Sequence, residues 1–471
     1  MLFFELRFIL FFLVVFSVYW TLQRASHRKI WLLICSYFFY GCWNVHLLGL
    51  IWLSSFIDYA IGKALFSSED PRRRKLFITS SVVANLTILG FFKYFNFFTE
   101  SAAVFLSWLG LPATPFTLNI LLPIGISFYT FQSMSYTLDI YRGRIKSAAT
   151  PLDFFLYVAF FPQLVAGPIV RAKTFLPQLR EGRHFASIDV RLCLMWFLVG
   201  FFKKTCVADY LNLFITYYDQ SPAIWFTLGS WGINALYYIQ LYCDFSGYTD
   251  MAYGCAGLLG YRLCRNFSFP LLAKNVQQFW QRWHISMGSW FRDYVYAPLR
   301  GNNKSFPSVT RSIFITFLLV GLWHGAGWKY VIQLGLYGGL MVLYLSFVRL
   351  RKRPAGRLLL PVSLDILLLW FVHCLANIFF RAPDLDTAFV MTGSLFSWTA
   401  PGFERIHPSL IYFTGLIVAV TIAHYGVYKK WWSEWWRKMS DGWFVLFYGA
   451  AWAMVLSLKV QNYTPFIYFQ F

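Results

Sequence analysis

The stretch Phe314-Ile-Thr-Phe-Leu-Leu-Val-Gly-Leu-Trp323-His324 is almost wholly apolar and ends in a histidine. Such a run is typical of a membrane-spanning helix, and an ionisable residue inside one is costly enough to be interpreted as functional. The whole chain shares this character: 58% of its 471 residues are hydrophobic, 13% are charged, and the mean hydropathy is +0.53. Soluble proteins are closer to about 45–50% apolar and about 25% charged. The sequence therefore predicts an all-α polytopic membrane protein.

Apolar runs recur along the whole chain, which we interpret as one multi-pass membrane domain, 1–471, without a soluble domain. The predicted spans are 2–21, 30–44, 46–66, 76–95, 119–138, 152–170, 192–217, 224–243, 309–328, 331–348, 358–379, 409–428 and 442–460. The run 152–170 contains Pro162 and Pro168, which predict a broken or re-entrant helix. Within the domain we distinguish N-terminal helices (1–150), a core with the candidate site (151–330) and C-terminal helices (331–471).

Lysine and arginine gather in clusters between the apolar runs. The clusters fall within 24–29, 72–75, 142–146, 171–191, 262–304, 349–357 and 429–438. Under the positive-inside rule these clusters face the cytoplasm. If 152–170 is re-entrant and 2–21 is the first span rather than a cleaved signal, both termini are predicted outside. The net charge of +21 then reflects membrane topology, and no nucleic-acid partner is predicted.

His324 is the first candidate for chemistry. An imidazole has an ordinary pKa near 6.5, which suits a general base at neutral pH. Trp323 precedes it, and Gly321, Gly325 and Gly327 leave room for a substrate or a backbone to approach closely. The alternative is a structural histidine bonded to a neighbouring helix. A second candidate, His284, lies in a mixed polar and aromatic stretch.

Other polar residues precede or surround these histidines. The stretch 262–308 mixes charges with tryptophan, which predicts amphipathic helices in the membrane interface, and there His284 has a structural alternative at the headgroup level. Two carboxylates on the preceding segment are expected to orient a histidine or to bond arginine and backbone groups. Two arginines are expected to form ion pairs, contact lipid headgroups or hold an anionic donor. The supporting candidates are Asp244, Ser246, Asp250, Asn266, Arg282, Arg292 and Asp293.

Several kinds of site are not indicated. No His, Cys and Asp cluster has the spacing of a metal site, and the eight scattered cysteines indicate neither a metal nor a disulfide framework. No bound cofactor is predicted. No Gly-x-Ser-x-Gly elbow is present, which disfavours a hydrolase-type serine nucleophile. A transporter or channel, and a scaffold without chemistry, remain alternatives from other classes.

The sequence resembles the membrane-bound O-acyltransferases, in the branch that includes the alginate O-acetylase and the teichoic-acid D-alanyl transfer protein. The resemblance rests on Trp323-His324-Gly325, on Trp283-His284, and on two earlier stretches, Leu122-Pro123-Ile-Gly125 to Gln132 and Phe160-Phe-Pro162-Gln163 to Ile169. It covers most of the chain. It implies a ring of tilted helices with re-entrant and interfacial helices around a central tunnel or funnel. It also implies that His324 and His284 are catalytic and face a shared tunnel.

The resemblance further implies transfer of an acyl group from a cytoplasmic thioester, with acetyl-CoA as the expected donor, to a hydroxyl on the outer side. His324 would act as a general base or form an acyl-histidine intermediate. The expected acceptor is an exported polysaccharide such as alginate, cellulose or peptidoglycan, reached with a periplasmic partner from a bacterial inner membrane. The alternative within the family is D-alanyl transfer to teichoic acid from a carrier protein.

Overall fold

The computed structural model describes residues 1–164, 167–220, 227–351, 362–398, 409–431, 434–460 and 465–466. These residues form helices and no strand, so the predicted all-α class is confirmed. They fall into two compact units, which are described separately. Unit 1 comprises Met1–Phe197 and Tyr248–Cys264, and unit 2 comprises Leu198–Gly247 and Arg265–Phe471. Ala166, with the basic residues Lys352, Arg353 and Arg357, lies outside the described residues.

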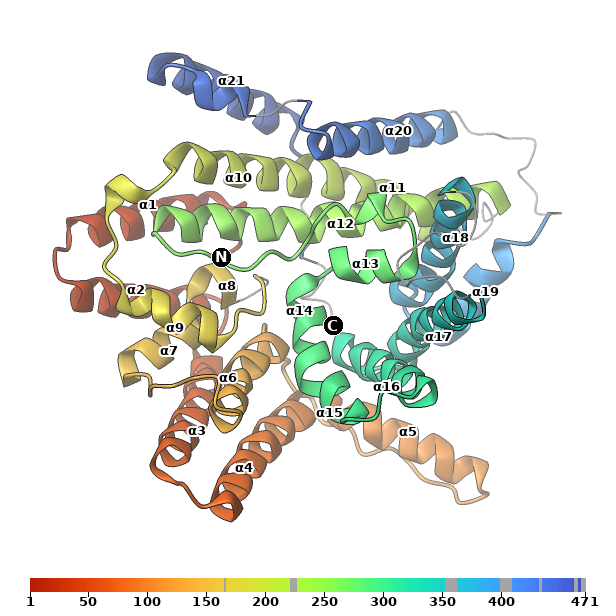
Figure 1. The fold of residues 1–471 in the computed structure, drawn as a ribbon. Helices are drawn as coiled ribbons and strands as arrows, with labels where there is room; N and C mark the ends of the chain where they lie inside the picture. Colours follow the sequence, from red (N-terminus) through yellow and green to blue (C-terminus); the bar gives the residue numbers. More distant parts are fainter. Residues whose placement is uncertain are drawn as a thin grey trace. The chain divides into compact units, whose positions relative to one another are not determined.

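Unit 1 consists of helices joined by turns and loops, with a long loop between Trp108 and Ile126 (Figure 1). They are α1 (Leu6–Thr21), α2 (Ala25–Gly41), η1 (Val45–Leu47), α3 (Leu48–Ser67), α4 (Pro71–Leu89), η2 (Gly90–Tyr94), α5 (Phe95–Trp108), α6 (Ile126–Tyr141), α7 (Pro151–Ala159), α8 (Phe161–Leu164), α9 (Ala172–Arg180) and η3 (Phe185–Ser187). Helices α3, α4 and α6 pack on one another, and α7 packs on α2 and α3. Almost all of α6 is buried, so it is the centre of this bundle.

The run 152–170 is broken, as its two prolines predict. Helix α7 ends at Ala159, and after Phe160 the chain forms only the four-residue helix α8. Pro162 lies inside α8, and a proline cannot donate a backbone hydrogen bond, so a continuous helix is disfavoured here. The side chains around the break are buried in protein, where irregular backbone is tolerated.

Unit 2 contains the second half of the chain. Two helices run from one unit into the other, α10 (Val190–Phe202) and α12 (Thr227–Leu258). The remaining elements are η4 (Lys203–Ala208), α11 (Asp209–Asp219), η6 (Pro270–Leu272), α13 (Val276–Arg282), α14 (Ile285–Phe291), η7 (Arg292–Tyr296), α15 (Ala297–Arg300), α16 (Phe306–His324), α17 (Trp328–Leu350), α18 (Val362–Arg381), α19 (Leu385–Ser394), α20 (Ser409–Tyr428), η8 (Trp435–Lys438) and α21 (Asp441–Leu458). Helices α16 and α17 form a hairpin, and α13 and α18 pack on α17.

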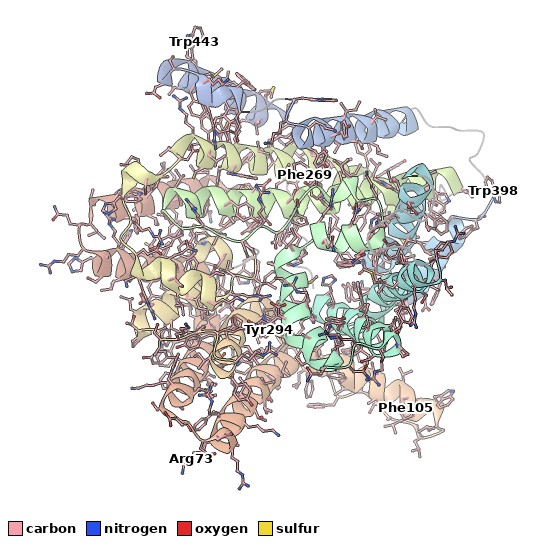
Figure 2. The ribbon with its side chains drawn as sticks, in the orientation of Figure 1. Arg73, Phe105, Phe269, Tyr294, Trp398 and Trp443 are labelled. Carbon is pink, nitrogen blue, oxygen red and sulfur yellow. The ribbon has the colours of Figure 1, made fainter. Side chains whose placement is uncertain are left out.

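Five helical segments in the described part of the chain are long and apolar enough to cross a membrane. They are Val45–Ser67, Pro71–Trp108, Phe306–His324, Trp328–Leu350 and Asp441–Leu458. Each corresponds to a predicted span, although the second is longer than predicted because α4 continues through η2 into α5. Large apolar side chains such as Phe105 and Trp443 project outward from these helices and are mostly exposed (Figure 2). Such surfaces suit lipid rather than water, and the chain is a multi-pass membrane protein. The other predicted spans, and the three-part division of the domain, stay predictions.

Candidate functional site

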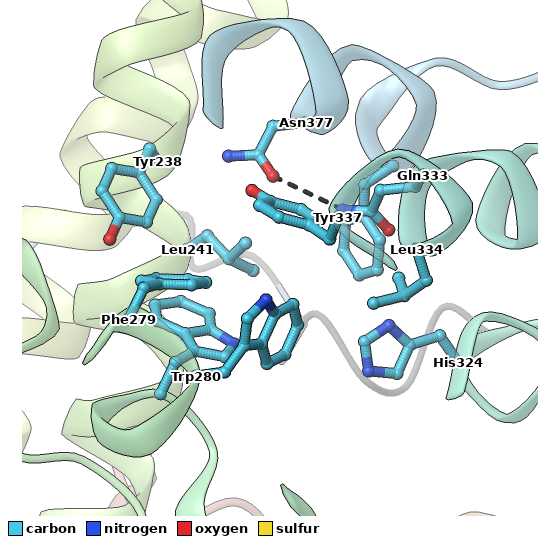
Figure 3. Close-up of a pocket in the computed structure, with 11 residues that line it drawn as sticks. Tyr238, Leu241, Phe279, Trp280, His324, Gln333, Leu334, Tyr337 and Asn377 are labelled. Atoms are coloured by element: carbon cyan, nitrogen blue, oxygen red, sulfur yellow. Dashed lines mark hydrogen bonds between the residues drawn. The ribbon is translucent and has the colours of Figure 1, made fainter. Parts of the chain in front are cut away.

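A small cavity lies inside unit 2, where α12, α13, α16, α17 and α18 meet (Figure 3). Its volume is about 30 Å³. The residues that line it are Tyr238, Leu241, Phe279, Trp280, Trp283, His324, Gln333, Leu334, Tyr337, Asn377 and Phe380. The walls are mainly aromatic and aliphatic with a few polar atoms, which is the usual composition of a small-molecule site. His324, the main candidate from the sequence, is therefore a wall residue of a cavity.

His324 is the last residue of α16, and its side chain is buried. Its ring lies 5.3 Å from that of Trp323 and 5.9 Å from that of Phe380 of α18. Glycine allows the tight packing of the α16–α17 hairpin beside it. A Cβ atom on Gly321 would lie 2.5 Å from the backbone oxygen of Tyr330, and one on Gly325 would overlap the Tyr330 ring. The room predicted around His324 is thus used by the backbone and side chain of α17.

His284 precedes α14 and has an unusual backbone. Its φ is +40° and its ψ is +54°, in the left-handed region that few residues other than glycine adopt. Asn266 holds the chain directly after it. The Ile285 amide donates to the Asn266 backbone oxygen at 2.9 Å, and the Ser286 hydroxyl donates to the Asn266 side-chain oxygen at 2.5 Å. Asn266 therefore fixes the loop that carries His284, and its supporting role in the chemistry stays a prediction.

Trp323 connects the two histidines. Its ring centroid is 5.9 Å from that of His284 and 5.3 Å from that of His324. Unit 2 thus brings together two residues that are 40 positions apart in the sequence. His284 is completely buried, although its polar surroundings in the sequence suggested the interface. Burial, and to a smaller extent the neighbouring His324, hold the pKa of His284 well below its usual value. His284 is consequently a neutral imidazole at neutral pH.

Asp244 binds a partner that the sequence analysis did not name. Its carboxylate lies 2.6 Å from the Nζ atom of Lys204, which lies 2.8 Å from the carboxylate of Asp209. All three side chains are about 1% exposed. From the sequence, Asp244 is expected to orient a histidine or to bond arginine and backbone groups, and this buried lysine of η4 is not indicated. The available signal was Lys204 and Asp209 inside the apolar run 192–217, since charges there need partners.

The remaining carboxylate and hydroxyl candidates lie on the same long helix. Ser246 and Asp250 of α12 are both buried. Ser246 falls in unit 2 with the two histidines, whereas Asp250 falls in the part of α12 that belongs to unit 1. Their supporting roles stay predictions.

The charged residues near His284 differ in their partners: Arg292 pairs with a carboxylate, whereas Arg282 bonds a backbone oxygen. Arg292 and Asp293 form an ion pair of 2.9 Å, with Arg292 largely exposed. Arg282 is half-buried and donates to the backbone oxygen of Phe269 at 3.3 Å. The ion-pair expectation is confirmed for Arg292 and Asp293. That either arginine holds an anionic donor stays a prediction.

Four polar residues at or beside the cavity were not identified as site residues from the sequence: Gln333, Tyr337, His373 and Asn377. Gln333 of α17 donates through its side-chain nitrogen to the Asn377 oxygen of α18 at 3.4 Å (Figure 3). Tyr337 and His373 share a hydrogen bond of 2.6 Å. All four side chains are buried. Polar residues inside the apolar runs 331–348 and 358–379 were the available signal, but only packing shows that they meet.

Metal chemistry has no visible basis in the part of the chain that the structure describes. No group of three or more His, Cys, Asp or Glu side chains there is arranged to hold a metal ion. The structure shows no disulfide among the eight cysteines, all of which lie in the described residues. Acid–base chemistry by the buried histidines is what the arrangement can perform.

Comparison with known proteins identifies the class of protein. A sequence profile of the membrane-bound O-acyltransferase family matches residues 141–380, which include both histidines and all the residues that line the cavity. The chain belongs to the membrane-bound O-acyltransferase family and is an acyltransferase.

Individual relatives refine this likeness. The chain is 34% identical to a probable alginate O-acetylase of Pseudomonas putida over 98% of this chain and 99% of that protein. It is 33% identical to a peptidoglycan O-acetyltransferase of Helicobacter pylori over 80% of this chain and 76% of that protein. It is 31% identical to a teichoic acid D-alanyltransferase of Bacillus subtilis, but over only 50% of this chain and 62% of that protein.

Proposed function

We propose that this protein O-acetylates an exported cell-envelope polysaccharide, with acetyl-CoA as the cytoplasmic donor. The observation that carries the proposal is His324 in the wall of a small cavity, within a chain that matches a probable alginate O-acetylase over 98% of its length. The similarity to a peptidoglycan O-acetyltransferase supports the same acyl group and a polysaccharide acceptor. The similarity to a D-alanyltransferase covers only half of the chain, so it supports membership of the family but gives weaker support for D-alanyl transfer.

In the proposed reaction, the acceptor hydroxyl attacks the carbonyl carbon of the thioester. A new C–O bond forms and the C–S bond breaks, so the products are an O-acetyl ester and a thiol. His324 removes the proton of the hydroxyl during the attack and returns it to the leaving sulfur. No atom changes oxidation state overall. An imidazole suits this work because it can accept a proton and then donate it.

His284 is proposed to act beside His324 through the intervening Trp323. Its left-handed backbone places strain at one residue, and such strain persists only when the surroundings hold it. The hydrogen bonds from Ile285 and Ser286 to Asn266 supply that support. A residue kept in a costly conformation next to the proposed base favours a functional role for His284 over a packing role.

The proposed location is a bacterial inner membrane with both termini outside. The basic clusters would then face the cytoplasm, where an anionic donor such as acetyl-CoA arrives. A partner outside the membrane is proposed to complete transfer to the polysaccharide. Membrane lipid covers the exposed apolar helices.

The test is acetyl transfer by the purified full-length protein in lipid vesicles. Radiolabelled acetyl-CoA is supplied outside the vesicles, and thioester cleavage and labelled ester are measured for wild type, His324→Ala and His184→Ala. His184 is an exposed histidine of unit 1 and serves as the matched control. Cleavage that needs His324 but not His184 is the expected result. Equal cleavage by wild type and folded His324→Ala would overturn the assignment of His324.

The same assay distinguishes the donors. If a D-alanyl carrier protein is consumed in a His324-dependent reaction and acetyl-CoA is not, the acetyl proposal is wrong while the acyltransferase class stands. Vesicles that transport a solute but cleave neither thioester would instead favour a transporter.

A further inference from the structure

We propose that His373 is a positioning residue for His324. It acts through Tyr337, whose hydroxyl it holds, as part of a series of polar contacts that fixes helix α17 against α18. The inference rests on the proposed function, because it assigns His373 to the reaction that His324 is proposed to perform. It stands on the spacing of the polar contacts, on the burial of His373 and Tyr337, and on the close packing of α17 against α16.

Helices α17 and α18 are joined by polar contacts at regular intervals. The α17 members are four residues apart, so they lie on one face of that helix; they are Lys329, Gln333 and Tyr337. Lys329 donates to the Ala382 backbone oxygen, just after α18, at 2.6 Å. Gln333 donates to the Asn377 side chain at 3.4 Å, and Tyr337 shares a hydrogen bond of 2.6 Å with His373. The partners follow in reverse order along α18, so these bonds fix the register of two antiparallel helices.

His373 lies near the middle of α18 and is itself held firmly. It is 1% exposed, and its partner Tyr337 is 3% exposed. The His373 ring is stacked on Tyr238 with centroids 4.4 Å apart and meets Phe279 at 4.2 Å. Side chains of α12, α13 and α17 therefore surround the imidazole, and a closely packed ring cannot rotate on its own. His373 can consequently keep the Tyr337 hydroxyl in one place by accepting from it at Nδ1.

Tyr337 carries this constraint to the cavity. Tyr337 and His324 both line it (Figure 3). The Tyr337 ring stands edge-on to Trp280 with centroids 5.3 Å apart and lies 6.0 Å from the ring of Phe279. Both of these rings also line the cavity. A fixed Tyr337 hydroxyl therefore fixes a set of rings in the wall of the cavity to which His324 belongs.

Close packing of α17 against α16 transmits the same constraint to the backbone of His324. A Cβ atom on Gly338 of α17 would lie 2.9 Å from the Cβ atom of Phe317 on α16. A Cβ atom on Gly321 of α16 would lie 2.5 Å from the Tyr330 backbone oxygen of α17. The two helices thus touch at two levels and leave no room to slide. A shift of α17 against α18 consequently moves α16, which ends in His324.

A positioning role differs from a packing role in what its loss changes. Hydrogen bonds between membrane helices contribute only modestly to stability. A misplacement of about 1 Å at a catalytic site, by contrast, lowers the rate by about 10²-fold. Loss of the Tyr337–His373 hydrogen bond is therefore expected to change the rate more than the stability.

The first experiment measures kcat and KM for acetyl-CoA cleavage by the full-length protein in lipid vesicles. Tyr337→Phe and His373→Leu should each lower kcat by about 10- to 100-fold with little change in KM. The double variant should be no slower than the slower single variant, because all three lack the same hydrogen bond. His373→Asn keeps a side-chain acceptor and should recover part of the rate. Tyr217→Phe and His184→Leu, at exposed positions, are the matched controls and should leave kcat unchanged.

The second experiment does not depend on turnover. Diethyl pyrocarbonate modifies histidine rings, and mass spectrometry measures the rate of modification at His324 in the same variants. Tyr337→Phe and His373→Leu should raise that rate by the same factor, because both loosen the wall beside His324. The rate at His184, measured in the same molecules, should not change. If His373→Leu does not fold, Tyr337→Phe still tests the proposal, since it removes only one hydroxyl.

The outcomes separate the two proposals. If cleavage of acetyl-CoA needs His324 but Tyr337→Phe and His373→Leu keep the wild-type kcat and labelling rate, the positioning role is overturned and the proposed function stands. Losses that multiply in the double variant also overturn it, because the two residues then act independently. So does a far larger loss in His373→Leu than in Tyr337→Phe with a changed pH profile, which would make His373 itself a proton carrier. If wild type cleaves no thioester in a His324-dependent way but labelling of His324 responds equally to both variants, the proposed function fails and the positioning of His324 stands.

Discussion

Two groups of buried polar side chains, one in each unit, differ in how completely their hydrogen bonds are made. In unit 1, Asp58 of α3 accepts from Ser81 at 2.6 Å and from Asn85 at 2.9 Å on both carboxylate oxygens, and Ser81 also bonds Thr137 at 2.8 Å. In unit 2, the amide pair at the cavity makes one long hydrogen bond and leaves a nitrogen and an oxygen unused among the described residues.

The completeness of the hydrogen bonds distinguishes a structural polar cluster from a functional one inside an apolar protein. Both clusters are equally buried, so burial does not separate them. The Asp58 cluster satisfies its carboxylate with hydrogen bonds from within the chain. Gln333 and Asn377, which line the cavity, each have one side-chain polar atom without a hydrogen-bond partner among the described residues. Unmet capacity beside space favours a ligand.

Loss of the His324 imidazole has the largest expected effect. His324→Ala should lower acyl transfer by about 10²- to 10⁴-fold, the usual contribution of a general base. The thermal unfolding temperature in detergent should change little, because the residue lies at the end of a helix beside empty volume. Rate and unfolding are measured on the same preparation. A large loss of stability with unchanged turnover per folded molecule would show that His324 has a structural role and not a catalytic one.

Removal of the Asp58 carboxylate should have the opposite profile. Asp58→Ala leaves the donors of Ser81 and Asn85 without their acceptor, and each such group costs about 1–3 kcal/mol. The unfolding free energy in detergent should fall by roughly 2–4 kcal/mol, while turnover per folded molecule stays within about twofold. Glu69→Ala, an exposed carboxylate just after α3, is the control. If turnover instead vanishes at unchanged stability, the Asp58 cluster is functional.

Gly321→Ala tests whether the fit of α16 against α17 sets the position of His324. A Cβ atom there would lie 2.5 Å and 2.9 Å from backbone atoms of Tyr330 and Val331, so α17 must move. A shift of about 1 Å at a catalytic site lowers rates by about 10²-fold, and we expect a loss of about 10- to 100-fold. Gly339→Ala on α17, where nothing lies within 4 Å, should be neutral. Equal turnover by the two variants would show that His324 does not depend on this packing.

Asn266→Ala has the smallest expected effect. It removes the hydrogen bond from Ser286 but keeps the backbone bond from Ile285, so it should cost about 1 kcal/mol of unfolding free energy. If His284 is functional, turnover should fall several-fold more than stability predicts, because its left-handed backbone loses support. Asn302→Ala, at an exposed position, controls for loss of an amide. If turnover falls only as much as the loss of stability predicts, His284 has a structural role.

The sequence predicted much of this architecture where a local signal existed. Long apolar runs predicted the helices α3, α16 and α17, because lipid demands length and apolarity that can be read along the chain. Two prolines predicted the break after α7. The histidines at 284 and 324 were recognisable because ionisable residues are rare in such surroundings.

Partners that meet only in space could not be predicted in this way. Lys204, forty residues before Asp244 in the sequence, forms an ion pair with it that the sequence did not indicate. Asn377 and Gln333 are 44 residues apart and lie on different helices. Periodicity shows which residues share a face of one helix, but it does not show which face of another helix lies opposite.

The sequence alone determined that this protein consists of apolar helices, that basic residues gather between them, and that two histidines are exceptional, because composition and spacing act locally. Only the tertiary structure decided that Trp323 joins the two histidines, that glycines let α17 close against α16, and that an amide pair completes a small cavity. Those features depend on the packing of side chains from five helices, and packing is a property of their assembly in space.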